Sequence, residues 1–381
     1  MKVVFETNEV FSKLFSVTSV INPKSTIPIL SDVCISVNDK SIIFTASDGE
    51  NWATKRADVL TSDMDAVFCT PAKDIINCLG ALFDENVTMS LDEEGKTMTL
   101  EYTNGKINLP YESADEFPTP NINIDGASDF IVNSSLLKSH IKLAKSSTEN
   151  STIRPIMGGV HFRFDGEKMI INGASHKRIV KLVENIKLDN SANYHEFTLP
   201  PAASSVITKV LDGVDQDVKV RFTDKVVSIS NKDFKITARL LEGRFPDCDM
   251  VIPKVSPVKI EVDNDMVIQA LKRVLSIDNM NRLVVFSICG DNINISAEDV
   301  NFFRKSEESV KCDCNIQNEL VICFNGDVML ETLRSIESDT VVFEMSEPRR
   351  PALIGSKYEK DREKYVCVIM PMAVQPQVVQ Q

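Results

Sequence analysis

The sequence predicts an α+β fold made of three similar domains in tandem. The main observation is a repeat: the apolar positions of Cys69–Leu91 recur without a gap in Cys323–Met345, and a shorter copy lies at Val206–Phe222. In each copy a helical spacing of apolar residues changes to strict alternation, which indicates an amphipathic helix followed by a strand. The copies lie about 130 and 120 residues apart, whereas solenoid repeats have periods of roughly 20–50 residues. The chain of 381 residues therefore holds one copy per domain.

A different amphipathic helix is expected near the start of each domain. Its apolar stripe lies in Val10–Val17, Leu136–Ala144 and Met266–Leu275, and the last of these repeats at i, i+1, i+4 and i+5. Two alternating segments around a short turn follow each helix, which indicates a hairpin. The expected strand pairs are Asp32–Val37 with Ser41–Ala46, Val160–Phe164 with Met169–Asn172, and Leu283–Ile288 with Asn292–Ser296.

The predicted domains span residues 1–125, 126–254 and 255–381, each with two helices packed on antiparallel sheets. The boundaries fall in Pro118–Ser128 and Ile252–Val258, which are rich in Pro, Asn, Asp or Lys and lack periodicity. Thr70 with Pro71, and Asn325, are candidate N-caps for the helices of the repeat. A triplication is also compatible with structural economy alone, without functional content.

The composition is that of a globular protein without a targeting segment. Residues 1–10 lack the apolar core of a signal peptide, and no apolar run reaches the roughly 18 residues of a membrane span. The nine cysteines include no C-x-x-C pair, so neither a zinc site nor a redox motif is indicated. We therefore expect reduced thiols in a cytoplasmic protein, with no metal and no cofactor.

The net charge of −13 argues against binding to nucleic acid, because phosphate contacts need a basic surface. The charges are unevenly placed, however, and Lys138, Lys142 and Lys145 follow one another at i, i+4 and i+7 on one predicted helix. Lys or Arg also lies on the polar side of most of the other predicted helices. Such faces are either solvated helix surfaces or a local positive potential that attracts a polyanion.

No catalytic constellation is apparent in the sequence. The four histidines are not spaced as metal ligands, and His161, which alternates with apolar neighbours on a strand, is expected to face solvent or a partner. No phosphate-binding loop or nucleophile elbow occurs. A lone catalytic Ser or Cys stays open as an alternative, although nothing places a base beside one.

Five short motifs, in a fixed order along the chain, carry a resemblance to a known family. They are Asn22–Leu30 (NPKSTIPIL), Glu116–Pro118, Leu241–Pro253 (LEGRFPDCDMVIP), Cys323–Asn325 and Tyr365–Met372 (YVCVIMPM). Together with the triplication they closely resemble the bacterial DNA polymerase sliding clamp, the beta subunit of the replicative polymerase holoenzyme. The similarity runs from Met1 to about Val374, and Gln375–Gln381 extend past the usual end as a polar tail.

The resemblance implies a processivity factor without catalytic activity. In that family a head-to-tail homodimer forms a closed ring, whose helices line a hole around double-stranded DNA and whose sheets form an acidic rim. A ring is held on DNA by topology, so weak contacts that do not read the sequence suffice. A clamp loader, the replicative polymerase and repair proteins are the implied protein partners. An enzyme of DNA or nucleotide metabolism, or a scaffold that binds only proteins, are the competing hypotheses.

The resemblance also implies DNA-facing and dimer-interface residues. The DNA-facing side chains would be Lys24, Lys73, Lys138, Lys142, Lys145, Arg154, Lys209 and Arg273. Pro155 and Ile156 stand where relatives often have aromatic residues, so stacking on bases is not expected there. Ile107 would meet the pair Val274-Leu275 of a second copy, and the alternative for this pair is the core of its own domain.

The implied partner site is an apolar cleft between the second and third domains that takes a short peptide. Its residues would be Met157, Ala174, His176, Lys177, Arg178, Ile179, Pro246, Met250, Val251, Met280, Asn325, Val328, Arg349, Val368, Met370, Pro371 and Met372. The methionines would give an adaptable lining, and Arg178 and Asn325 would bind polar groups of the peptide. Ala174–Arg178 departs from the T-D-G-H-R of relatives, so a different peptide preference is expected at that edge. For Met370–Met372 the alternative is a core strand with a loose end.

Overall fold

The computed structural model describes residues 2–82, 85–120, 124–149, 151, 153–189, 193–277, 282–316 and 318–373. The chain forms two compact units, each made of two segments. Unit 1 comprises Met1–Lys142 and Ile186–Glu242, and unit 2 comprises Leu143–Asn185 and Gly243–Gln381. Each unit is described by itself below. None of the described helices is both long enough and apolar enough to cross a membrane.

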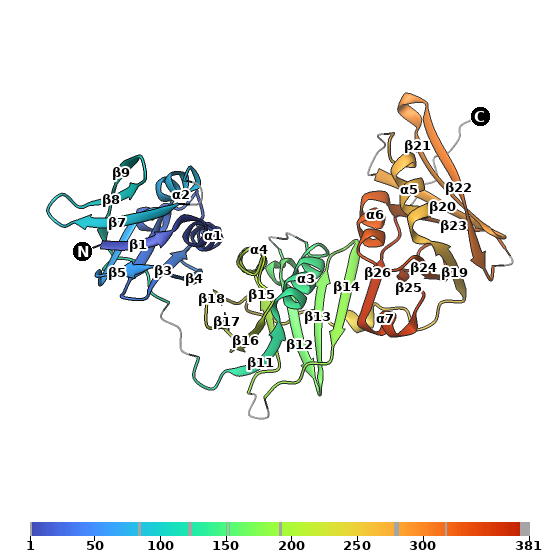
Figure 1. Ribbon diagram of the computed structural model, residues 1–381. Helices are drawn as coiled ribbons and strands as arrows, with labels where there is room; N and C mark the ends of the chain where they lie inside the picture. Colours follow the sequence, from blue (N-terminus) through green and yellow to red (C-terminus); the bar gives the residue numbers. More distant parts are fainter. Residues whose placement is uncertain are drawn as a thin grey trace. The chain divides into compact units, whose positions relative to one another are not determined.

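Unit 1 contains a small antiparallel sheet built from the first third of the chain (Figure 1). Its strands, in order across the sheet, are β5 (Thr61–Ser62), β1 (Lys2–Glu6), β7 (Asn86–Asp92), β8 (Thr97–Tyr102) and β9 (Gly105–Pro110). Within the described residues β9 pairs with β8 alone, so its other side is an open edge.

A larger antiparallel sheet in unit 1 joins strands from the first and middle thirds of the chain. Its strands, in order, are β10 (Glu112–Ser113), β6 (Ala66–Pro71), β2 (Asp32–Val37), β3 (Ser41–Ser47), β4 (Asn51–Asp58), β18 (Phe234–Arg239), β17 (Val226–Ser230), β16 (Asp217–Phe222) and β11 (Ser128–Asn133). The junction is the pairing of β4 with β18, in register from Lys55 opposite Phe234 to Asn51 opposite Ala238. The short strand β15 (Glu196–Leu199) also lies in this unit.

The helices of unit 1 bury one face against these sheets. They are α1 (Thr7–Thr18), α2 (Ala72–Gly80), α4 (Pro201–Val210), most of α3 (Ser134–Lys145) and the 3-10 turn η1 (Pro28–Ser31). α1 packs beside α2 and over β3 and β4 (Figure 1). Val10, Leu14 and Val17 are fully buried, whereas Phe15 of the predicted stripe is 60% exposed.

Unit 2 is organised on antiparallel strands from the middle and last thirds of the chain. Their order is β12 (Val160–Asp165), β13 (Lys168–Ala174), β14 (Arg178–Glu184), β26 (Tyr365–Ile369), β25 (Ala352–Ser356), β24 (Thr340–Met345), β19 (Val258–Asp263), β22 (Arg304–Cys314), β21 (Asn292–Asp299), β20 (Leu283–Cys289) and β23 (Leu320–Asn325). Its helices are α5 (Asn264–Val274), α6 (Gly326–Arg334) and α7 (Glu359–Lys364), with the 3-10 turns η2 (Pro155–Gly158), η3 (Cys248–Met250) and η5 (Val300–Phe302). α5 and α6 lie side by side (Figure 1).

The predicted repeat is confirmed in all three places. Its helix and strand are α2 and β7 in the first copy, α4 and β16 in the second, and α6 and β24 in the third. The three predicted hairpins are the pairs β2–β3, β12–β13 and β20–β21. Sequence reasoning missed the strands β1, β11 and β19, each of which directly precedes the opening helix of its third. These strands are short and run into the helix without a Gly or Pro to mark the change.

One predicted helix cap is confirmed and the other is wrong. The side chain of Asn325 accepts a hydrogen bond from the backbone N–H of Val328 at 3.0 Å and begins α6. Thr70 does not cap α2, because Pro71 holds the cap position and the Thr70 hydroxyl donates to the Pro110 carbonyl at 2.9 Å. Thr70 therefore ties β6 to the end of β9 instead of beginning the helix.

Candidate functional site

Four of the predicted cleft residues meet in one apolar cluster of unit 2. Ala174 at the end of β13, Ile179 on β14 and Val368 on β26 are buried together with Phe245 and Cys248. β14 lies between β26 and β13, so Ile179 has Val368 opposite it on one side and Ala174 opposite it on the other. Met157, half-buried on η2, packs against this cluster.

Further apolar side chains around the cluster remain accessible to solvent. Ile156, Ile252, Leu353 and Val366 are partly buried against it. Met250, the last residue of η3, is 84% exposed, and Val251, which follows it, is 40% exposed. In the sequence the exposed Met250 and Val251 lie between Cys248, which belongs to the cluster, and Ile252, which packs against it.

The predicted end of the cleft is held in place by backbone hydrogen bonds. The N–H of Met370 donates to the Lys177 carbonyl at 2.9 Å, and the N–H of Met372 donates to the Cys323 carbonyl at 2.8 Å. Met370, Pro371 and Met372 are therefore tied to the start of β14 and to β23, and each is only partly buried. This is an anchored segment rather than a loose end.

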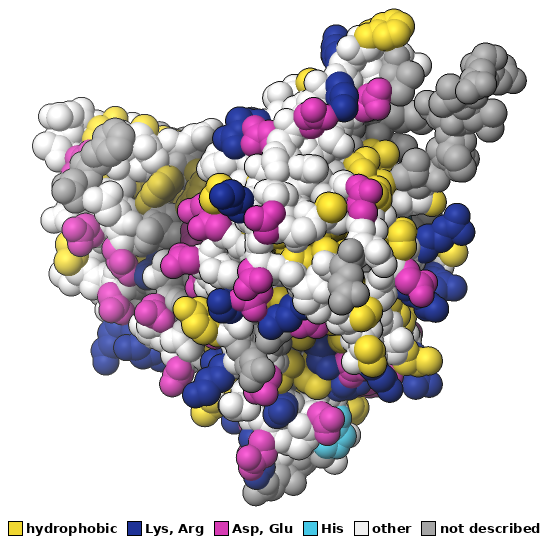
Figure 2. Space-filling model, turned by 90° about the vertical axis from the view of Figure 1, so that its right-hand side faces the viewer, with side chains coloured by type: hydrophobic (Ala, Val, Ile, Leu, Met, Phe, Trp, Pro, Cys, Tyr) yellow, Lys and Arg dark blue, Asp and Glu magenta, His cyan; other side chains and the backbone are white. Residues whose placement is uncertain are grey.

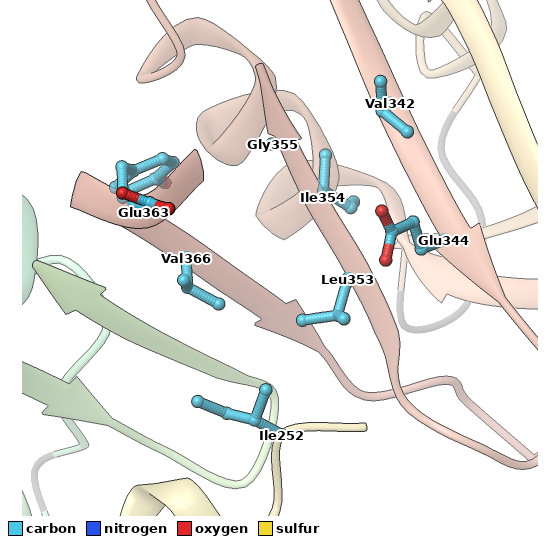
Figure 3. A pocket seen from close by; sticks show the side chains of 9 residues that line it. Ile252, Val342, Glu344, Leu353, Ile354, Gly355, Glu363 and Val366 are labelled. Atoms are coloured by element: carbon cyan, nitrogen blue, oxygen red, sulfur yellow. The ribbon is translucent and has the colours of Figure 1, made fainter. Parts of the chain in front are cut away.

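A cavity of about 330 Å³ begins where the apolar cluster meets the face of β24, β25 and β26 (Figure 3). It shares Ile252, Leu353 and Val366 with the packing around the cluster. In Figure 3 Val366 lies below Glu363 of α7, Leu353 lies below Glu344 of β24, and Ile252 lies lower than both apolar side chains. None of the predicted cleft residues lines this cavity, so the cavity lies beside the predicted cleft and is not part of it.

Arg178 is not available to bind a peptide, contrary to the prediction. Its side chain is 2% exposed, and its guanidinium donates at 3.0 Å to the Thr332 hydroxyl, at 2.7 Å to the Ser146 carbonyl and at 3.2 Å to the Glu331 carboxylate. Arg178 instead holds β14 to α6 and to the segment after α3. Asn325 likewise uses its side-chain oxygen to cap α6.

The remaining polar residues of the predicted cleft are on the surface. His176 is exposed and both its backbone N–H, at 3.1 Å, and its Nδ1, at 2.9 Å, lie within hydrogen-bond distance of Glu149 Oε2. These hydrogen bonds lower the pKa of Glu149. Lys177, Pro246 and Arg349 are exposed and Val328 is half-buried. Met280 lies outside the described residues.

His161 does not face solvent, which corrects the sequence prediction. It is 6% exposed and its ring stacks on Phe245 with the centroids 4.5 Å apart. Burial, helped by the nearby Arg163, lowers the pKa of His161 to about 4. The alternation on β12 fails as a guide because Phe245, from the segment after β18, covers the face that would otherwise meet water.

Asp249 on η3 forms ion pairs with two cations of the neighbouring strands, Arg163 and Lys181. Arg163 Nη2 lies 3.0 Å from one carboxylate oxygen, and Lys181 Nζ bonds the other. Burial alone would raise the pKa of Asp249, but the hydrogen bonds from Lys181 and Arg163 outweigh it and lower the pKa. This arrangement fixes η3, and with it the place of Met250 and Val251.

Close backbone packing also shapes this part of unit 2. A Cβ atom added to Gly173 would lie 1.8 Å from the Ala144 carbonyl oxygen. β13 therefore packs against the end of α3 with no room for a side chain at this position. Gly173 directly precedes Ala174, the first residue of the apolar cluster.

The predicted DNA-facing cations fall into two groups. Lys24, Lys73, Lys142, Arg154 and Lys209 are exposed and make no ion pair with any described residue. Lys138 is paired with Asp212 at 2.6 Å, and Arg273 binds Glu308 through two guanidinium nitrogens. Lys145 is half-buried. Two of the predicted cations are thus partly neutralised within their own unit.

Charges of both signs are interspersed on the face of the molecule seen in Figure 2. The net charge of −13 is therefore not gathered into one acidic patch on that face. Among the residues that the structure describes, no three His, Cys, Asp or Glu side chains gather as a metal-binding group.

Three successive stretches of the chain match the three domains of one known family. Residues 1–123 match the N-terminal domain, residues 131–247 the central domain and residues 249–373 the C-terminal domain of the DNA polymerase III beta subunit. The chain belongs to the DNA polymerase III beta subunit family. It is thus a member of the sliding clamps of DNA replication, and its three-domain α+β fold is the fold of that family.

Similar clamps are known from several bacteria. The Beta sliding clamp of Staphylococcus epidermidis is 23% identical over 362 residues, covering 92% of this chain and 94% of the relative. The structure of the DNA polymerase sliding clamp from Bacillus subtilis superposes with a TM-score of 0.89 at 22% identity, covering 98% of this chain and 100% of that one. The Pseudomonas aeruginosa sliding clamp bound to griselimycin gives a TM-score of 0.91 at 20% identity, with the same coverage.

The residues predicted for a dimer interface differ in accessibility. Ile107 is partly exposed on the open-edged strand β9, as an interface residue should be. Val274 and Leu275 are 0% and 6% exposed within unit 2, and a side-chain carbon on Gly326 would lie 2.6 Å from Leu275. This burial favours the alternative given for the pair, a place in the core of their own domain beside α5 and α6.

Sequence reasoning missed Phe245, Cys248, Ile252, Leu353 and Val366 around the cleft. Three of them lie within the LEGRFPDCDMVIP motif, so a search for apolar residues inside the motif would have found them. Val366 lies in the YVCVIMPM motif, two residues before Val368 on β26, so the same search would have found it. Leu353 carries no such signal, because only the pairing of β25 with β26 places it opposite Val368.

Proposed function

We propose that this chain is a processivity factor that encircles double-stranded DNA as a head-to-tail homodimeric ring. The observation that carries the proposal is a pair of open strand edges, one in each unit. In unit 1 the free side of β9 is open. In unit 2 the first part of β22, Arg304–Lys311, pairs with β21 on one side and with no described strand on the other.

Open edges of this kind favour pairing with a second chain. An unpaired edge is a template for another strand, and two different edges on one chain produce a heterologous contact. Such contacts close into a ring when the rotation between copies permits it. If β9 of each copy paired with β22 of the other copy, the two copies would form two equal interfaces. Neither β9 nor β22 would then keep an unpaired edge.

The exposed cations suit a ring that slides. Lys73, Lys142 and Lys209 extend into solvent from three different helices, and a few screened phosphate contacts would attract DNA without fixing its sequence. The enclosing chain, rather than affinity, would keep the ring on the duplex. The chain would then act in the cytoplasm as a tether, without catalysis.

The tethering function is assigned to the apolar surface around Met250 and Val251. Apolar positions on a segment fixed by Asp249 would receive a short peptide from the replicative polymerase, the clamp loader or repair proteins, and raise their effective concentration at DNA. A short peptide buries less than a standard interface, so affinities on the order of micromolar are expected.

Retention on circular DNA, combined with molar mass in solution, tests the ring. Protein loaded on a nicked plasmid by a clamp loader should stay bound through gel filtration and leave when the plasmid is cut once. The native mass should be twice that of the 42.5 kDa chain. A monomer, or equal retention on circular and linear DNA, would contradict the proposal.

The cleft is tested with Met250→Ala and a labelled peptide from the replicative polymerase. Because Met250 is 84% exposed, its truncation should leave folding unchanged and weaken peptide binding about tenfold. Val67→Ala is the matched control, since Val67 is a 56% exposed apolar residue in unit 1. Equal affinities of the two variants would remove Met250 from the site.

A further inference from the structure

Cys34 and Cys69 face each other across two neighbouring strands of unit 1. Cys34 on β2 lies directly opposite Cys69 on β6 in the antiparallel register. The two side chains lie close enough for each thiol to shift the pKa of the other, and both are free thiols. Cys34 is half-buried, whereas Cys69 is fully buried. Cys34 is thus the more accessible of the two cysteines.

The backbone places this pair in the closer of the two antiparallel geometries. The N–H of Asn38 donates to the Ser41 carbonyl at 3.0 Å, and hydrogen-bonded pairs alternate with non-hydrogen-bonded pairs along β2 and β3. Cys34 opposite Thr45 therefore falls in a hydrogen-bonded pair. Its backbone groups point toward β3 and away from β6, which makes Cys34–Cys69 a non-hydrogen-bonded pair.

This class of pair suits a covalent bond between the two sulfurs. Its Cα atoms are about 4.5 Å apart, inside the range of about 4.4–6.8 Å that a disulfide spans. In the described strands no other cysteine lies opposite a second one. Cys312 and Cys314 are two residues apart on one strand, where side chains stand parallel about 6.6 Å apart and do not converge.

We propose that Cys34 and Cys69 are a site of reversible oxidation that reacts with low-molecular-weight disulfides. The Cys34 thiolate attacks the reagent disulfide, forms a mixed disulfide and releases one thiol. The Cys69 sulfur then attacks the Cys34 sulfur, forms the bond between the two strands and releases the second thiol. Two protein thiols are oxidised, one small disulfide is reduced to two thiols, and the protons pass to the released thiols.

The surroundings assign the roles of the two sulfurs. The neighbouring Cys69 thiol lowers the pKa of Cys34, whereas the Cys34 thiol, burial and the carboxylates of Asp32 and Glu112 raise the pKa of Cys69. Cys34 is therefore the sulfur that attacks the reagent. The bond would fasten β6 to β2 just before Pro71, where α2 begins.

Treatment of the reduced full-length chain with oxidised glutathione tests the site. We expect a loss of about 2 Da, two fewer titratable thiols among the nine cysteines, and a peptide that joins the Cys34 and Cys69 fragments and disappears on reduction. Cys34→Ser and Cys69→Ser should each abolish this peptide, and Cys69→Ser should retain one glutathione on Cys34.

Cys289→Ser is the matched control, because Cys289 is an exposed cysteine elsewhere. This variant should form the joined peptide in full yield. A stable glutathione adduct on Cys34 of the unsubstituted chain, or nine intact thiols after the treatment, would overturn the proposal without reference to any variant.

Discussion

Unit 1 and unit 2 contain the same repeated helix and strand but use their polar side chains differently. In unit 2 two charged groups near the candidate cleft are bonded within the unit: Arg178 bonds three neighbours, and Asp249 binds both Arg163 and Lys181. In unit 1 the exposed lysines of the helices, such as Lys73 and Lys209, extend into water.

This difference shows what each kind of surface requires. A cleft for peptides needs a fixed apolar wall, so its polar residues serve the architecture and its binding groups are apolar. A surface for a mobile polyanion needs only charge at roughly the right place. Charged residues in the cleft motif are therefore poor indicators of ligand contacts, and exposed methionines and valines are better ones.

The largest expected effect separates the two halves of the predicted interface. Leu275→Asp puts a charge into the core between α5 and α6 and should lower the stability of unit 2 by more than about 4 kcal/mol. Ile107→Asp, on the open-edged β9, should leave stability unchanged and convert dimers to monomers. Denaturant unfolding and analytical ultracentrifugation measure the two outcomes. A well-folded monomeric Leu275→Asp protein would restore the interface interpretation.

Loss of the Arg178 guanidinium should have the next largest effect. Arg178→Met leaves the Thr332 hydroxyl and the Ser146 carbonyl without their buried donor and should destabilise unit 2 by about 3 kcal/mol. Arg349→Met, at an exposed position, is the control and should be neutral. Hydrogen exchange of β14 and α6 reports the difference. If Arg178→Met lost peptide binding with unchanged exchange, a direct contact would have to be reconsidered.

One titratable group in each unit should respond to acid in the opposite direction from the other. The pKa of His161 is lowered to about 4 in the folded chain, below its unfolded value of about 6.5, so the unfolded state takes up the proton first. Unit 2 should therefore lose about 2 kcal/mol as pH falls from 6.5 to 4. His161→Phe, which keeps a ring on Phe245, should flatten this dependence.

Unit 1 contains a group with the opposite sign. Burial, with a contribution from Glu112, raises the pKa of Asp32 to about 6 from 3.8, so the folded state binds the proton more strongly. Asp32 therefore favours folding below about pH 4 and loses that contribution as pH rises through 6. The single tryptophan, Trp52, is buried on β4 and reports on unit 1 alone. Asp32→Asn should remove this slope, and an unchanged slope would exclude Asp32.

The smallest expected effect concerns the N-terminal ends of α6 and α2, of which only α6 has a side-chain cap. Asn325→Ala removes the cap of α6 and should cost about 1 kcal/mol, with faster hydrogen exchange in the first turn. Thr70→Ala should leave exchange in the first turn of α2 unchanged, because Thr70 bonds Pro110 instead. Fraying of α2 in Thr70→Ala would show that Thr70 acts on the helix after all.

Local patterns in the sequence were sufficient for most of the fold. The change from helical to alternating spacing predicted α2 with β7 and α6 with β24, because one-sided burial imposes those periods. Burial by distant segments could not be predicted in this way. Phe245 covers His161, and Gly326 receives Leu275, and neither contact leaves a periodic trace in the sequence.

The cleft was predicted through its motif, and the errors within it follow a rule. Apolar members such as Ile179 and Val368 are where the motif implied, since apolar residues are buried whether or not a ligand is bound. Arg178 was misread because an arginine in a binding motif can serve either a ligand or the protein, and only its partners Thr332 and Ser146 decide.

The pairing of β4 with β18 has a practical consequence for handling this protein. Hydrogen bonds along that seam connect the N-terminal domain to a strand encoded more than a hundred residues later, and the indole N–H of Trp52 donates to the Pro118 carbonyl at 2.8 Å. Cutting the chain just after Pro118 would therefore not release the first piece. Two separately expressed fragments should reassemble along this seam, which makes the position a natural point for a split reporter.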